Sequence, residues 1–259
     1  MSWNIDGLDD NNVTTRAKSV CKTILSEKPD VVFLQEVVTK NLGVIKEYCT
    51  NYFVVLGTDR QLFPGEYFTV MLLRNDTTKY SNHSVQPFYS SIMSRTLLQV
   101  NAKVKGIEIC LLTSHLESTK TWEQERTKQF RKILDAAYEV PHSKAVILGG
   151  DFNLRDSELE KIGGLKNGLV DVWEQTGRRS EAQFTWDTKK NDNLSVSGRY
   201  KPRHRFDRLY YRSDCFIKAV YFELVGFDRV EACKRFPSDH WGIMAHFNIL
   251  PHVENKSLM

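Results

Sequence analysis

The segment AVILGGDFNLR, residues 145–155, places polar side chains directly after a short apolar run. The run is rich in branched residues and ends in two glycines, which is typical of a buried strand. Asp151, Asn153 and Arg155 follow it as an anion, an amide and a cation. A rigid strand ending in such groups can support reactive atoms, although an ordinary Asp/Asn turn has the same local sequence.

The ends of other predicted apolar strands also carry polar residues, namely Asn4, Asp6, Glu36, His115, Asp207, Asp239 and His240. Repetition of this pattern predicts that the strand ends meet at one edge of the fold. Carboxylates and amides dominate the set, and these hard oxygen donors suit Mg²⁺, or Mn²⁺ as a substitute, better than zinc. The sequence contains no phosphate-binding loop, GxGxxG or HExxH motif.

This donor set suits metal-assisted hydrolysis of a phosphodiester, which requires charge neutralisation, deprotonation of water and in-line attack. We expect Glu36 to be the direct metal ligand, with Asp6 supporting it through water. Asp151 is the expected general base, and the amides of Asn153 and Asn4 would position the water or a phosphate oxygen.

The histidines complete the expected catalytic set. His240 would contact the phosphate and stabilise developing charge, while Asp207 would accept a hydrogen bond from His240 and keep it protonated. His115 would make a second phosphate contact, and Asp239, beside His240, belongs to the same set. The acidic residues Glu117, Glu123 and Glu125 are expected to be solvated charges at a helix entry.

The bulk composition is that of a globular protein. The chain has 259 residues, 41% hydrophobic and 26% charged, with a net charge of +4. This mild excess of positive charge is compatible with a polyanionic partner.

Five scattered cysteines form no CxxC pair and suggest neither a disulfide framework nor a zinc site. No apolar run is long enough to span a bilayer. Because the chain opens almost inside a strand, we expect a catalytic domain, residues 1–259, taken from a longer protein with an N-terminal extension.

Hydrophobic periodicity predicts the elements that hold these residues. Helices are expected over 13–25, 41–49 and 122–138, with short ones over 157–162 and 170–175. Strands are expected over 31–35, 52–57, 67–74, 97–104, 107–114, 145–151, 205–212, 216–224 and 241–249. Residues 58–66, with Pro64-Gly65, and the polar stretch 185–202 are expected loops. The pattern indicates one α+β domain with two packed, mostly antiparallel sheets and flanking helices.

Several motifs resemble, in order, those of the endonuclease/exonuclease/phosphatase superfamily. They are Trp3-Asn4, Leu34-Gln35-Glu36, Thr113-Ser114-His115, Gly150-Asp151-Phe152-Asn153, Arg205-Phe206-Asp207 and Ser238-Asp239-His240. The resemblance covers nearly the whole chain and implies a four-layered α/β sandwich. Phe152 departs from the pattern, since threonine is expected there in vertebrate members, but it is expected to point away from the site.

Longer strings, including Thr113–Thr119 and Arg235–Gly242, resemble the branch that removes tyrosine from DNA 5′ ends after abortive topoisomerase II reactions. The resemblance implies a Mg²⁺ site at Glu36 and Asp6, a single-stranded or overhanging DNA end and a topoisomerase II-derived peptide as partners, and a nuclear location with the cytoplasm as a second one. We further expect a monomer that does not bind membranes.

The same resemblance implies a DNA-binding surface. Aromatic faces stack on bases without regard to sequence, and arginines contact phosphates. An apolar wall is expected from Tyr67, Trp186, Leu194 and Phe206. Phosphate or loop contacts are expected from Arg95, Arg155 and Ser118. A core position for Phe206, or a solvated charge for Arg95, is the alternative interpretation.

Two other functional classes stay open at this point. One is a different hydrolase of the same fold, such as an abasic-site endonuclease, a deadenylase, an inositol-phosphate phosphatase or a sphingomyelinase. The absence of a membrane-seeking apolar hairpin counts against the last. The other is a non-enzymatic DNA-binding scaffold, against which the intact set Glu36, Asp151 and His240 counts.

Overall fold

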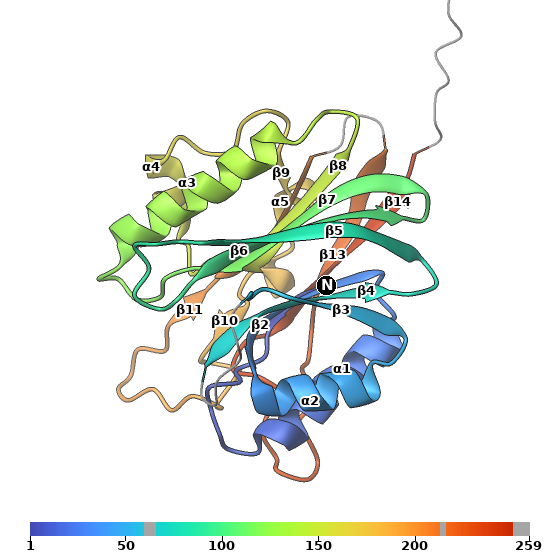
Figure 1. Cartoon of the computed structure of the whole chain (residues 1–259). Coiled ribbons are helices and arrows are strands. Elements are labelled where there is room, and N and C mark those ends of the chain that lie inside the picture. Colours follow the sequence, from blue (N-terminus) through green and yellow to red (C-terminus); the bar gives the residue numbers. More distant parts are fainter. Residues whose placement is uncertain (60–65, 213–215, 251–259) are drawn as a thin grey trace, which may run out of the picture.

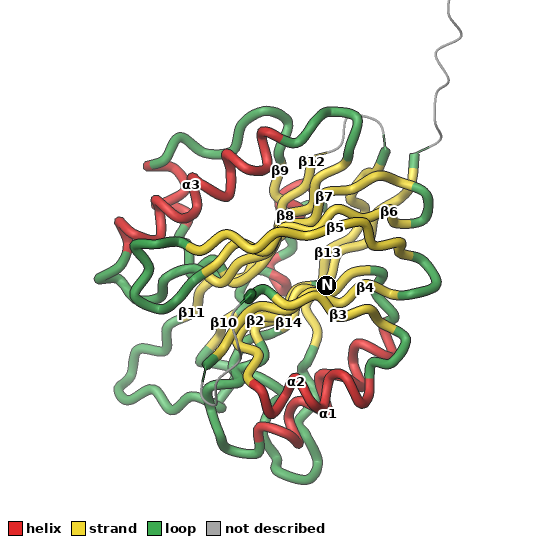
Figure 2. Tube along the Cα trace, in the orientation of Figure 1, coloured by secondary structure: helices red, strands yellow, loops and turns green. Residues whose placement is uncertain are grey.

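Two six-stranded sheets lie face to face and carry helices on their outer faces (Figures 1 and 2). The computed structural model describes residues 1–59, 66–212 and 216–250. The expected four-layered α/β sandwich is confirmed by this arrangement. In the described part of the chain no helix is long and apolar enough to cross a membrane.

The first sheet has the strand order β13-β14-β1-β2-β4-β3. Its strands are β1 (Ser2–Asn4), β2 (Val31–Val38), β3 (Tyr52–Leu56), β4 (Tyr67–Arg74), β13 (Ile217–Val225) and β14 (Gly242–Ile249). Only β1 and β2 run parallel to each other. The first and last strands of the described residues, β1 and β14, are therefore neighbours in this sheet.

The second sheet has the order β5-β6-β7-β8-β12-β9. Its strands are β5 (Thr78–Pro87), β6 (Thr96–Val104), β7 (Ile107–His115), β8 (Ala145–Asp151), β9 (Val170–Asp171) and β12 (Asp207–Arg212). Here β7 and β8 are the parallel pair. A short hairpin of β10 (Trp186–Asp187) and β11 (Arg203–His204) lies outside both sheets.

Helices α1 (Val13–Glu27) and α2 (Thr39–Tyr48) cover the first sheet, and α3 (Glu123–Glu139) covers the second (Figure 1). Shorter helical segments follow, namely α4 (Asp156–Lys161), α5 (Val172–Gln175) and a 3₁₀ turn at Ser180–Ala182.

Side-chain alternation along the strands divides the interior into layers. Phe33 on β2 and Leu111 on β7 point between the sheets, where Met71 and Leu209 join them. Their neighbours point outward: Val32 and Leu34 pack against α1 and α2, while Cys110 and Leu112 pack against α3. Strands buried on both faces are apolar at consecutive positions, which explains the continuous apolar runs in the sequence.

The expected elements are present with small shifts, and two differences have clear causes. Strand β5 was not predicted, because it is an edge strand whose ten residues are exposed or half-buried and mostly polar. The predicted helix 170–175 begins as β9, since Val170 and Asp171 pair with β12 before the turn of α5. Most of the expected loop 58–66, including Pro64-Gly65, lies outside the described residues.

Candidate active site

The ends of the central strands meet at one edge of the sandwich, as predicted from their polar termini. Asn4 ends β1, His115 ends β7 and Asp151 ends β8. In the second sheet Asp151 stands opposite His115 on one side and opposite Asp207 on the other. The close approach of β8 to β7 requires Gly150, because a Cβ atom there would lie 2.1 Å from the Ser114 carbonyl oxygen.

Glu36 reaches the site through an irregularity in β2. The pairing of β2 with β4 shifts register between Leu34 and Val37. Glu36 lies in this bulge with a left-handed backbone, φ 54°, and bulges of this kind re-aim a side chain. Its Oε1 accepts a hydrogen bond from Asn4 Nδ2 at 3.2 Å.

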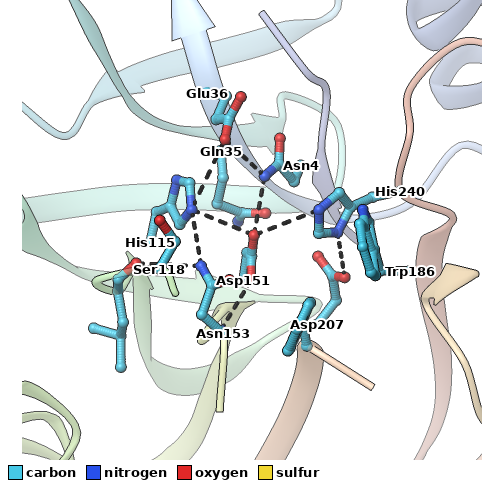
Figure 3. A network of polar contacts seen from close by, with 12 residues as sticks. Asn4, Gln35, Glu36, His115, Ser118, Asp151, Asn153, Trp186, Asp207 and His240 are labelled. Carbon is cyan, nitrogen blue, oxygen red and sulfur yellow. Dashed lines mark hydrogen bonds and ion pairs between the residues drawn. The ribbon is translucent and has the colours of Figure 1, made fainter. Parts of the chain in front are cut away.

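Asp151 is the centre of the polar network (Figure 3). Its Oδ2 accepts from Asn4 Nδ2 at 3.0 Å and lies 3.3 Å from His115 Nε2 and 3.8 Å from His240 Nε2. Its Oδ1 accepts from the Asn153 backbone amide at 3.0 Å. Burial opposes ionisation, but the interactions with His115, His240 and Asn4 outweigh it and hold the pKa of Asp151 well below its usual range. Asp151 is therefore an anion at neutral pH.

His240 is held as a cation. Burial disfavours its charged form, but the carboxylates of Asp207, Asp239 and Asp151 outweigh burial and hold the pKa of His240 well above its usual value. Its Nδ1 lies 2.8 Å from Asp207 Oδ2, in the hydrogen bond that the sequence predicted. The Trp3 indole donates to the His240 carbonyl at 2.9 Å, which fixes the backbone at this position.

His115 has a different neighbour on its Nδ1. Arg95 Nη1 lies 2.7 Å from that nitrogen, while His115 Nε2 faces Asp151 and the Asn153 side-chain amide at 3.3 Å. Arg95, with 6% of its surface exposed, is therefore not the solvated charge of the alternative interpretation. Its guanidinium also covers the Tyr67 ring at 5.0 Å.

The carboxylates at the mouth of the site crowd one another. Burial raises the pKa of Asp6 to about 7, and the nearby charges of Asp239 and Glu36 add to this effect while Arg16 opposes it. Asp6 Oδ2 lies 3.2 Å from the Arg16 guanidinium. Asp239 accepts a hydrogen bond from the Trp186 indole at 3.1 Å. A cation between these carboxylates would relieve their repulsion.

A second group with ligand-like spacing contains Asp151, Asp207 and His240, whose candidate atoms lie within 4.8 Å of one another. Asp207 Oδ2 is already hydrogen-bonded to His240 Nδ1, and a protonated imidazole has no free lone pair for a metal. Glu36 is a better candidate ligand, because its carboxylate is half-buried and Asn4 holds only one of its oxygens in the described contacts.

An aromatic surface flanks the His240 side. The ring centroids of Trp186 and Phe206 lie 5.8 Å apart, and His204 stacks on Phe206 at 4.7 Å and on Trp186 at 5.9 Å. The Arg155 guanidinium lies 5.8 Å from the Phe206 ring centre. Phe206 is half-buried rather than a core residue. Leu194 is 48% exposed in the segment between β10 and β11.

Tyr67 and Ser118 lie on the opposite side, with His115. The Tyr67 hydroxyl donates to the Met93 carbonyl at 3.2 Å, and burial raises the pKa of Tyr67. The Ser118 hydroxyl contacts the Met93 sulfur at 3.4 Å. The Tyr67 ring lies 6.3 Å from the His115 ring. Figure 3 shows His115 and Ser118 on one side of Asp151 and Trp186 on the other.

Two residues of this region were missed or misjudged from the sequence. His204 was not among the residues expected at the site, although its ring stacks on Phe206. The available signal was its position two residues before Phe206, since side chains spaced by two in an extended segment share a face. Glu117 was predicted to be a solvated charge but is fully buried, because its carboxylate accepts hydrogen bonds from the amides of Ile92 and Met93. Phe152 points away from the site as expected and packs on Phe130 and Tyr210.

Comparisons with known proteins agree with this geometry. The endonuclease/exonuclease/phosphatase family model matches residues 1–240. Tyrosyl-DNA phosphodiesterase 2 of Xenopus laevis is 44% identical over 253 residues, which are 96% of this chain and 66% of that protein. The human protein of the same name is 41% identical over 253 residues, 96% of this chain and 68% of that protein. The chain thus spans about two thirds of the length of these relatives.

Among solved structures, D. rerio TDP2 complexed with a single-strand DNA product superposes with a TM-score of 0.90 at 40% identity. The match covers 95% of this chain and 97% of that one. With a family model that matches most of the sequence and relatives this similar over nearly its whole length, the chain belongs to the endonuclease/exonuclease/phosphatase family, within the group of the tyrosyl-DNA phosphodiesterases 2.

Proposed function

We propose that the chain hydrolyses the phosphodiester that joins a tyrosine phenol oxygen to a DNA 5′ end and leaves a 5′-phosphate. The observation that supports this most is the buried Asp151 anion, held between a cationic His240 and the amides of Asn4 and Asn153. An anion that accepts protons and a cation that faces the same space are the pair needed to attack a phosphodiester. The name of the relatives supports the choice of tyrosyl-DNA as substrate.

The chain's own residues divide the work. Asp151 orients the attacking water and accepts its proton, and Asn153 and Asn4 fix the carboxylate that does so. The His240 imidazolium stabilises the charge that develops on the phosphate oxygens, and His115 donates a second hydrogen bond there. Because tyrosine has a pKa of about 10, its phenolate leaves without a strong general acid.

The donor set fits a divalent metal ion of the hard class, Mg²⁺ with Mn²⁺ as a substitute. Glu36 would hold the ion directly, and Asp6 would support it through water. Such an ion, when bound, neutralises phosphate charge and lowers the pKa of a bound water. Crowding of Asp6, Glu36 and Asp239 at the mouth of the site supports this location.

The aromatic surface of Trp186, His204 and Phe206 would take the terminal bases of a single strand or overhang by stacking. Leu194 would extend this wall, and Arg155 would contact a phosphate. On the other side of the site, Tyr67, Arg95 and Ser118 complete the proposed substrate contacts. The relative whose structure holds a single-strand DNA product supports binding of a single strand.

The biological substrate in this proposal is the peptide that topoisomerase II leaves on a DNA end. That substrate implies a nuclear location, with the cytoplasm as a second one. We also propose that the chain works as a monomer, since one copy contains every residue assigned to the reaction.

The test is release of tyrosine from a 5′-phosphotyrosyl oligonucleotide with a single-stranded end, in Mg²⁺ and in EDTA. We expect metal-dependent release that leaves a 5′-phosphate and is abolished in Asp151→Asn. Asp135→Asn is the matched control, because Asp135 is an exposed acid on α3 outside the site.

The alternative hydrolases of this fold are tested beside it with an abasic duplex and an inositol polyphosphate. Turnover of either one in place of the phosphotyrosyl ester would keep the chemistry and replace the substrate. If none of the three is cleaved but the oligonucleotide still binds, the chain is a DNA-binding scaffold.

A further inference from the structure

Glu117 is a buried carboxylate close to the site with no part in the proposed chemistry. It follows β7, two residues after His115, and 0% of its surface is exposed. Its Oε1 accepts from the Ser91 hydroxyl at 2.5 Å and from the amides of Ile92 and Met93 at 3.0 and 3.2 Å. Consecutive backbone amides that converge on one oxygen form a strong anion site. Glu117 therefore anchors the segment between β5 and β6.

The backbone of Glu117 is itself rigidly held. Its amide donates to Gln129 Oε1 at 3.1 Å, and its carbonyl accepts from Arg126 Nη1 at 2.9 Å. Both partners belong to the buried face of α3. The segment that Glu117 holds is different, since Tyr89 and Ile92 are 92% and 60% exposed. A fixed carboxylate thus holds an otherwise solvent-facing segment in place.

The anchored segment leads directly to the catalytic residues. The Ser91 hydroxyl, which donates to Glu117, also accepts from the Arg95 amide at 2.9 Å. Arg95 then reaches His115 Nδ1 with its Nη1 at 2.7 Å. A chain of contacts therefore runs from Glu117 through Ser91 and Arg95 to His115.

The last contact determines where His115 carries its proton. A guanidinium has only donors and stays charged, so the nitrogen that faces Arg95 must be an acceptor. His115 Nδ1 is then unprotonated and the proton sits on Nε2, which faces Asp151 Oδ2 at 3.3 Å. The Asn153 amide, at the same distance from Nε2, donates to the Leu116 carbonyl at 3.3 Å instead. Without Arg95 in place, either tautomer of His115 could form.

We propose that Glu117 is a positioning residue that holds Arg95 against His115 and so keeps the ring proton of His115 on Nε2, the nitrogen that faces Asp151. Only the expected effect of Glu117 on turnover rests on the proposed function. The tautomer of His115 is a property of the protein alone, so the positioning role and the proposed function can fail separately.

The experiment records long-range ¹H–¹⁵N spectra of the full chain, with His115 assigned from His115→Gln. We expect one tautomer with the proton on Nε2 in the parent protein and a mixture of tautomers in Glu117→Ala. Turnover of the phosphotyrosyl oligonucleotide should fall about tenfold in Glu117→Ala with little change in KM, the size seen when a histidine loses its supporting contacts. Glu117→Gln keeps an acceptor oxygen and should restore part of both signals.

Glu125→Gln is the matched control. Glu125 contacts the same segment through the Ser90 hydroxyl at 2.6 Å, but that hydrogen bond is exposed and does not lead to Arg95. Its spectrum and turnover should match those of the parent. If Glu117→Ala does not fold, Ser91→Ala removes the next contact of the chain and should shift the same His115 signals.

A single Nε2–H tautomer in both Glu117→Ala and Ser91→Ala would overturn the proposal, whatever happens to turnover. A mixture of tautomers in the Glu125→Gln control would overturn it as well. If the parent protein fails to cleave the ester while Glu117→Ala still alters the His115 spectrum, the proposed function fails and the positioning role stands.

Discussion

Asp151 has a histidine on each side, and the two histidines turn Nδ1 to partners of opposite charge. On one side His240 turns its Nδ1 to the Asp207 carboxylate and carries a positive charge. On the other side His115 turns its Nδ1 to the Arg95 guanidinium, which offers only donors and so leaves Nε2 as the donor of this ring. Both rings face the same carboxylate oxygen with Nε2, at 3.8 and 3.3 Å.

The comparison shows that the partner on the far nitrogen sets what each histidine offers to the reaction. A cation on the His240 side attracts the phosphate and stabilises its developing charge. The Nε2 donor on the His115 side adds a second hydrogen bond to the site. Two imidazolium rings beside Asp151 would weaken it as a proton acceptor.

Removal of the Asp151 charge is expected to have the largest effect, because both histidines and Asn4 are arranged around it. Asp151→Asn should lower turnover of the phosphotyrosyl ester by about a thousandfold, within the range for loss of a general base. Steady-state release of tyrosine measures this, and circular dichroism checks the fold. Retention of more than about a tenth of the parent rate would remove Asp151 from the role of base.

Loss of Asp207 tests the His240 side alone. Asp207→Asn removes a carboxylate that raises the pKa of His240, so the imidazolium would deprotonate at lower pH than in the parent. Turnover should fall about a hundredfold at neutral pH, as for loss of one charge-stabilising donor. The alkaline limb of the pH profile should also move to lower pH. An unchanged alkaline limb would show that His240 does not act as the cation.

Arg95→Gln tests the His115 side. The glutamine amide can donate or accept, so it no longer forces Nδ1 of His115 to be the acceptor. We expect a loss of turnover of about tenfold, smaller than for Asp207→Asn because no charge on a histidine is lost. A larger loss than for Asp207→Asn would reverse the ranking of the two sides.

The smallest effects are expected at Trp186, where two contributions can be separated. Trp186→Ala removes a stacking face and should weaken single-strand binding about tenfold, the lower part of the range for base stacking. Trp186→Phe keeps an aromatic ring and loses the indole hydrogen bond to Asp239. This variant should bind the single strand about threefold more weakly or less, since the net contribution of one hydrogen bond is small. Fluorescence anisotropy of a labelled oligonucleotide measures both. Equal losses would show that the Asp239 contact, rather than stacking, determines binding.

The layers of the fold and the meeting of the strand ends could be predicted from the sequence. The apolar runs and the polar residues that end them are both local features of the chain. Val31–Leu34 and Ala145–Leu148 are apolar at consecutive positions, as strands buried on both faces must be. Strand β5 was missed for the complementary reason, since an exposed edge strand has no apolar face to reveal it. The roles assigned to Glu36 and Asp6 as metal ligands stay predictions, as do the DNA contacts.

The sequence by itself determined which side chains are available to the site, because residues such as Asn4, His115 and Asp151 follow their strands directly. Only the tertiary structure decided the state of each group. Glu117 is acidic like Glu123 and Glu125, yet it alone of the three is fully buried, among amides 24 to 25 residues earlier in the chain. Whether a histidine meets Arg95 or Asp207 depends on contacts between distant strands, and those contacts set which of its nitrogens can donate.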